Sequence, residues 1–135
     1  MATRSTIAIE FADGSVSQIY CHWDGYLDNN GKILQKHYMD PFKVRDLIDC
    51  GSVSSLRESV EESKDNTGNP WPADRYMNVD EYFAECRQEE YDYILLNRND
   101  KATWYVRYWD TQGNWIPVEM AVINEQDRIA QEETE

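Results

Sequence analysis

Three short segments near the C-terminus constrain the fold most, because they are rich in aromatic and β-branched residues. They are YDYILL at 91–96, ATWYVRYW at 102–109 and NWIPVE at 114–119. Such side chains favour strands, and the polar NRNDK and DTQGN segments between them favour turns. The pattern predicts a three-stranded antiparallel meander. Pro117 has no amide hydrogen to donate, so the last strand is expected at a sheet edge.

The N-terminal region predicts a β-hairpin. Residues 6–11 place apolar side chains at every second position, which is typical of a half-buried strand. The Asp13-Gly14 pair favours a tight turn, because both residue types tolerate positive φ angles. Residues 16–23 then resume as a second strand.

Two helices are predicted in the following stretch. Residues 26–38 carry apolar side chains at helical spacing, although the segment 29–31 (Asn-Asn-Gly) contains poor helix formers. Asp40 suits the N-cap of the second helix, because its carboxylate can accept a hydrogen bond from a free amide of the first turn. Gly51 suits the left-handed residue that ends this helix.

The middle of the chain is polar, and residues from about 58 to 77 are expected to form a long surface loop. Asn78, with Glu81 three residues later, predicts the start of a short helix. Residues 123–135 are expected to be an acidic tail, either a frayed helix or disordered. The fold class is therefore α+β: one domain over residues 1–122, with an antiparallel sheet of about five strands and two or three helices mainly on one face.

Negative charge is concentrated in two parts of the sequence. The chain carries a net charge of −13, and residues 58–92 hold eleven acids against three bases. Residues 119–135 hold six acids against one base, and the remainder balances. Binding to nucleic acid or to an anionic membrane surface requires clustered basic residues, so neither is expected. The charge either keeps the protein soluble or imitates a polyanion that meets a basic partner.

The cysteines and the hydropathy pattern indicate a cytoplasmic protein. Three cysteines without a CxxC pair favour free thiols in a reducing compartment. The N-terminus lacks the apolar segment of a secretory signal, and no apolar run approaches the ~18 residues of a membrane span.

The CHWDGY segment at 21–26 groups several reactive residue types at the end of the second predicted strand. Strand alternation points Cys21 to one face and His22 with Asp24 to the other, so too few side chains converge for a metal site, which takes three or four ligands. No metal or cofactor is expected. The favoured interpretation is structural: the cysteine lies in the core, and Asp24 forms a turn with Gly25 and caps the next helix. The alternative is a small hydrolase or ligand-binding domain that uses the side chains of Tyr20, His22, Asp24 and His37.

A second candidate site lies on the meander. Alternation puts Tyr105, Arg107 and Trp109 on one face of their strand, and aromatic residues beside an arginine are typical of binding hot spots. A helix, the polar loop or the tail could instead cover this face. Nearby acids extend the candidate binding surface; they are Glu81, Glu85, Glu89, Glu90 and Asp92.

The N-terminal part of the chain resembles a family of small uncharacterised proteins from bacteriophages, prophages and some bacteria. The resemblance covers residues 3–56, through TRSTIAIEFADGSVSQIYCHWDGYLDNNGKILQKHY and LIDCGSVSSL, and residues 20–26 are its most specific element. It implies a phage gene product inside a bacterial cell, but it transfers no catalytic residue.

The leading hypothesis is a non-enzymatic protein that binds a basic surface of a host protein, as an inhibitor or in counter-defence. A homodimer with a structural or assembly role is a third hypothesis, beside the hydrolase.

Overall fold

The computed structural model describes residues 2–65 and 67–134, the side chains of 65, 133 and 134 excepted, and confirms the α+β class. The strands are β1 (Ser5–Glu10), β2 (Val16–Trp23), β3 (Val53–Ser55), β4 (Asp74–Tyr76), β5 (Tyr91–Arg98), β6 (Lys101–Tyr108) and β7 (Ile116–Pro117). The α-helices are α1 (Lys32–His37), α2 (Pro41–Asp49), α3 (Val60–Asp65), α4 (Val79–Glu85) and α5 (Val118–Thr134). A π-helical turn at Leu27–Gly31 precedes α1, and a 3-10 turn at Trp109–Thr111 follows β6.

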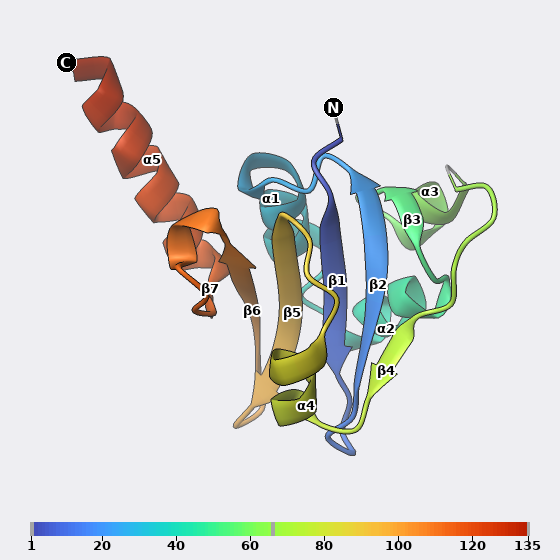
Figure 1. Cartoon of the computed structure of the whole chain (residues 1–135). Coiled ribbons are helices and arrows are strands. Elements are labelled where there is room, and N and C mark those ends of the chain that lie inside the picture. The colour runs from blue at the N-terminus through green and yellow to red at the C-terminus, as the bar shows by residue number, and fades with distance from the viewer. Residues whose placement is uncertain (1, 66, 135) are drawn as a thin grey trace.

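All the strands belong to one sheet in the order β3-β2-β1-β5-β6-β7, and β4 pairs with β2 (Figure 1). The predicted hairpin is β1–β2, and the predicted meander is β5–β6–β7 with Pro117 in the edge strand. The prediction of a purely antiparallel, five-stranded sheet is wrong. The hairpin joins the meander through a parallel pairing of β1 with β5, and β3 also runs parallel to β2. Three-residue strands such as β3 and β4 are too short to give a periodic pattern.

The first face of the sheet carries the larger core. Helices α1, α2 and α5 pack against it, as Leu34, Leu47 and Ala121 are all buried in one cluster with the inward side chains of β1, β2, β5 and β6. Trp104 is buried there, and its indole Nε1 donates a hydrogen bond to the carbonyl oxygen of Tyr38 at 2.9 Å. A tryptophan buried with its N–H satisfied combines a large apolar area with no unpaired donor.

The second face is covered in part by α4. Tyr82 of this helix is buried against Ala8, Val16 and Ile94, and half-buried aromatic side chains pack around the cluster. The described residues form five α-helices, so the prediction of two or three is wrong; the helices lie on both faces of the sheet, with most of them on the first.

The segment predicted as a loop at 58–77 contains α3 and β4. Its polar side chains make local hydrogen bonds: the Ser59 hydroxyl accepts from the amide of Glu62 at 3.1 Å, and buried Ser63 donates to the Ser59 carbonyl at 3.0 Å. The Ser59 cap stabilises the first turn of this short helix, and the bond of Ser63 supplies an acceptor for a buried hydroxyl. The region 123–135, predicted as a frayed or disordered tail, belongs to α5 as far as Thr134; residue 135 lies outside the described residues.

Candidate functional site

The CHWDGY segment places Tyr20 and His22 together on the second face of the sheet. The Tyr20 hydroxyl and His22 Nδ1 are hydrogen-bonded at 2.7 Å. The Trp71 ring stacks on the Tyr20 ring with centroids 5.8 Å apart, and the Arg87 guanidinium lies 4.6 Å from the Tyr20 centroid. Beside them is a shallow hollow of about 260 Å³, lined by these rings and by hydroxyl-bearing residues that include Ser52.

Asp24 takes no part in this group, because it turns the backbone. It is exposed, has φ +58°, and its carbonyl oxygen accepts a hydrogen bond from the Asn29 side chain at 3.0 Å. The prediction that Asp24 caps the next helix is wrong. Tyr26 occupies the N-cap of the π-helical turn, with no side-chain hydrogen bond to it.

Cys21 and His37 lie away from His22. Cys21 is fully buried in the core of the first face, where burial raises the pKa of its thiol, and a protonated thiol is a poor nucleophile. His37 ends α1, which packs on that same first face, and its Nε2 lies 3.6 Å from Glu58. Of the four side chains in the hydrolase hypothesis, the structure brings only Tyr20 and His22 into contact.

The candidate binding face of the meander is largely packed. Tyr105 is half-buried in the cluster beneath α4, and the Arg107 guanidinium lies 4.7 Å from the Trp115 ring centroid. Arg107 also pairs with Asp92 at 3.3 Å. Trp109 differs from these residues, because it follows the end of β6 and is 63% exposed.

Asp92 lies inside the molecule. Its carboxylate accepts hydrogen bonds from the Thr6 hydroxyl at 2.7 Å and from the Glu89 amide at 3.1 Å. Burial raises the pKa of Asp92, while these hydrogen bonds and the Arg107 charge partly oppose that rise. Asp92 therefore organises the second face, where Gln18 also donates to Thr6 at 2.8 Å.

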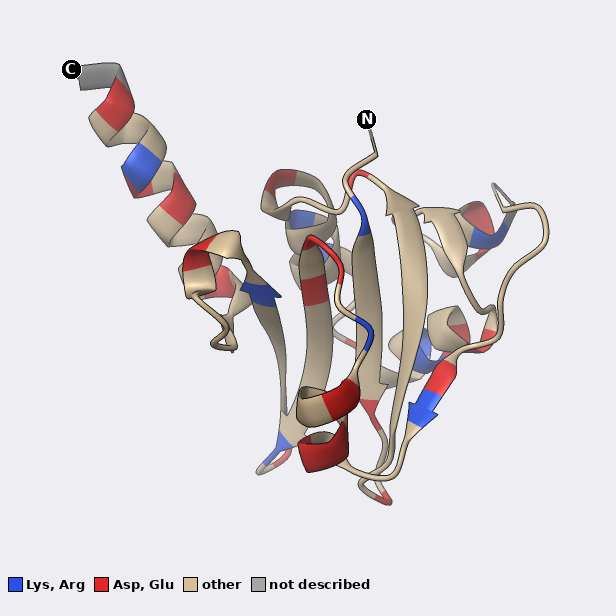
Figure 2. Ribbon diagram, viewed as in Figure 1, with Lys and Arg blue, Asp and Glu red and all other residues tan. Residues whose placement is uncertain are grey.

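The remaining candidate acids differ in their contacts and exposure. Glu81 accepts a hydrogen bond from the Met77 amide at 2.7 Å and so caps α4. Glu89 pairs with Arg87 at 3.2 Å, whereas Glu85 and Glu90 are exposed. The acids of residues 58–92 do not form one patch, because α3 packs beside α2 and α4 covers the opposite face of the sheet (Figure 2).

Helix α5 is the part of the acidic C-terminal segment that the sequence predicted only as a frayed helix or a disordered tail. Only its beginning is buried, at Val118 and Ala121, and the rest extends beyond the sheet (Figure 1). Ile123 is 52% exposed, and Met120 and Ile129 are also exposed. The weak apolar stripe of 118–129 could have indicated this helix, but the acids that separate its apolar residues suggested a tail.

The described residues give no sign of a metal centre or a membrane-spanning helix. No group of three His, Cys, Asp or Glu among them could hold a metal ion. In the same part of the chain, no helix has both the length and the apolar character needed to cross a membrane.

Comparison with known proteins adds no assignment: no protein-family model, curated protein or solved structure matches the chain. The coordinates define the class as an α+β protein with one mixed sheet and a projecting acidic helix.

Proposed function

We propose that this protein acts by binding a partner protein with a basic surface, and that α5 together with Trp109 is its docking element. The observation that carries the proposal is the projecting part of α5, which exposes acidic and large apolar side chains together. Recognition of an exposed helix by a groove is a common mode of protein binding.

The charge of α5 specifies the partner's chemistry. Its exposed acids include Glu119, Asp127 and Glu132. Figure 2 shows acidic positions in red along the helix. Arg128, the one basic residue of the helix, pairs with Glu132 at 2.9 Å and with Glu125 at 3.8 Å. The helix therefore retains a negative charge, which complements lysines and arginines around a partner's groove.

Trp109 adds an apolar anchor beside the helix. The Arg128 guanidinium lies 5.7 Å from the Trp109 ring centroid, and the Tyr108 ring contacts the indole edge-on at 6.0 Å. An exposed tryptophan held by neighbours loses little side-chain entropy on binding, and tryptophan is enriched in hot spots. The resemblance of residues 3–56 to phage proteins supports a bacterial host protein as this partner, bound as an inhibitor or in counter-defence, with the acids standing in for a polyanion.

Capture from bacterial lysate with the full chain tests the proposal. We compare the wild-type chain with Ile123→Ser/Ile129→Ser and with Glu119→Gln/Asp127→Asn. The captured protein should be basic, its yield should fall about tenfold between low and moderate salt, and both α5 variants should lose it. The purified partner should reproduce this pattern with the purified chain.

Matched controls distinguish docking from general stickiness. Met77→Ser removes an apolar side chain that is 80% exposed far along the chain from α5. Asp46→Asn/Asp49→Asn removes two exposed acids from α2. Both controls should retain the partner. Equal loss in controls and α5 variants, salt-independent capture, or self-association that the α5 variants abolish would contradict the proposal.

A further inference from the structure

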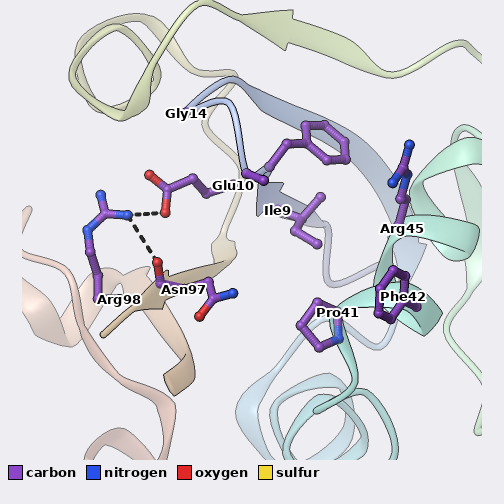
Figure 3. Close-up of a pocket in the computed structure, with 10 residues that line it drawn as sticks. Ile9, Glu10, Gly14, Pro41, Phe42, Arg45, Asn97 and Arg98 are labelled. Atoms are coloured by element: carbon purple, nitrogen blue, oxygen red, sulfur yellow. Dashed lines mark hydrogen bonds and ion pairs between the residues drawn. The ribbon is translucent and has the colours of Figure 1, made fainter. Parts of the chain in front are cut away.

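A separate hollow of about 340 Å³ lies where β1 and β5 end (Figure 3). Ile9, Glu10 and Phe11 contribute from the end of β1, and Asn97 and Arg98 from the end of β5. These two strands are parallel neighbours, so their carboxyl ends meet at one edge of the sheet. In open sheets, crevices outside the carboxyl ends of parallel strands are common sites for small ligands.

Apolar side chains form one side of this hollow. Pro41 and Phe42 reach it from the first turn of α2, and Ile9 forms part of its floor (Figure 3). The Phe42 side chain is 75% exposed, whereas Phe11 and Phe83 are both partly buried. The flat aromatic ring of Phe42 favours a ligand that also has a flat apolar ring, because two such rings can stack.

Two arginines supply positive charge at the same hollow. The Arg45 guanidinium lies 5.9 Å from the Phe11 ring centroid, and among the described residues it forms no ion pair. Arg98 pairs with Glu10 across the hollow from Arg45 (Figure 3). The charged lining residues therefore sum to one positive charge in a chain whose net charge is −13.

The amino end of α2 is not the source of this positive charge. Asp40 caps it by accepting a hydrogen bond from the Phe42 amide at 3.0 Å, so its first free donor is already occupied. An incoming anion would meet Arg45, whose planar guanidinium can donate two parallel hydrogen bonds to a carboxylate.

We infer that this hollow binds a small molecule that combines a flat apolar ring with a carboxylate. The ring would lie against Phe42 and Pro41, and the carboxylate would pair with Arg45. The volume is at the small end of the range for ligand pockets, which suits a ligand of one or two rings. The inference does not depend on the proposed partner, because no α5 residue lines this hollow.

Titration of the full chain with 2-naphthoate, followed by amide NMR shifts, tests the inference. Saturable shifts should centre on Glu10, Phe11, Phe42 and Asn97. The neutral 2-naphthamide should bind about tenfold more weakly, because it lacks the charge that Arg45 recognises. Arg45→Gln, which keeps a good helix former in α2, should weaken naphthoate by a similar factor and leave naphthamide unchanged.

Control variants locate the effect at the hollow. Phe42→Ala should weaken both probes, whereas Met77→Ala and Arg57→Gln, at exposed positions outside it, should weaken neither. Equal affinity for the two probes, shifts centred elsewhere, or the absence of saturable shifts would overturn the inference. A peptide ending in phenylalanine that binds more tightly than naphthoate would overturn the assignment to a small molecule.

Discussion

At the scale of the residue, Gly25 shows how closely the backbone packs after β2. A Cβ atom at this position would lie 2.5 Å from Ser5 Cβ and 2.9 Å from the carbonyl oxygen of Thr3. The Gly25 amide donates to that same Thr3 carbonyl at 2.8 Å. The backbone at Gly25 therefore lies so close to residues 3–5 that no methyl group fits between them.

We predict that Gly25→Ala lowers the free energy of unfolding by about 1–3 kcal/mol, because the added methyl forces the two segments apart. Urea denaturation measures this change. Gly68→Ala is the matched control, since a Cβ there meets nothing within 4 Å, and it should leave the urea midpoint nearly unchanged. Equal effects of the two substitutions would contradict the packing argument.

Asp92 illustrates the limit of residue-level inference from sequence. The sequence places Asp92 among the acids of an exposed candidate binding surface, yet its carboxylate is buried beside Thr6 and Arg107. The alternation of β5 places Asp92 on the same face as Ile94, which was the available signal. Whether that face is covered depends on α4, which packs there through tertiary contacts.

At the scale of the element, α2 begins and ends where its sequence indicates. Pro41 occupies the first turn, the Asp40 carboxylate accepts from the Phe42 amide, and Gly51 has φ +80° after the last turn. These are local preferences of proline, aspartate and glycine, so they can be predicted without knowledge of the rest of the molecule.

We predict that Asp40→Ala destabilises the protein by about 1 kcal/mol, because the Phe42 amide loses its acceptor. Asp40→Asn should cost only a small part of this, since the asparagine oxygen can accept the same hydrogen bond. Thermal unfolding followed by circular dichroism compares the two variants. An asparagine variant as unstable as the alanine variant would show that the carboxylate charge, and not the cap, matters.

Helices α3 and α5 show why other elements were harder to predict. Helix α3 is stabilised at its first turn by a serine cap and has no apolar stripe that a sequence pattern could reveal. Helix α5 has an apolar stripe, but acidic residues interrupt it. The first turns of α5 are stable in part because Val118 and Ala121 are buried against the sheet. The helix also contacts the π-helical turn at Leu27–Gly31 and α1, which are remote in sequence, and most helical stability in proteins comes from such tertiary packing.

At the scale of the whole molecule, the parallel pairing of β1 with β5 joins the two halves of the chain. Ser5 pairs with Tyr91 and Ile9 with Leu95, so residues more than 80 positions apart lie side by side. Both strands also contribute to the buried clusters on the two faces. We therefore expect the hairpin and the meander to unfold as one cooperative unit.

We predict that the amides of β2 and β6 exchange with solvent through the same global unfolding reaction. Native-state hydrogen exchange measures the free energy of opening for each amide, and the central amides of both strands should give equal values. Ile7→Ala, in the buried part of β1, should lower both by about 2–5 kcal/mol. A lower value for β2 alone would show that the N-terminal half unfolds independently.

The sequence by itself determined the local structure of this protein: the hairpin, the meander, the edge position of Pro117 and the two caps at Asp40 and Asn78. Each depends on alternation, turn residues or side-chain acceptors within a few positions of the chain. The separation of His22 from Cys21 on opposite faces follows from the same alternation.

Only the tertiary structure decided how these pieces meet. The parallel pairing of β1 with β5, the burial of Asp92 beside Thr6 and Arg107, and the hollow beside Phe42 all bring together segments far apart in sequence. The local sequence preferences of a strand are the same whichever edge of the sheet it joins, and those of a helix are the same whichever face of the sheet it covers. The choice among these arrangements is made by the burial of apolar area over the whole chain, which no short segment encodes.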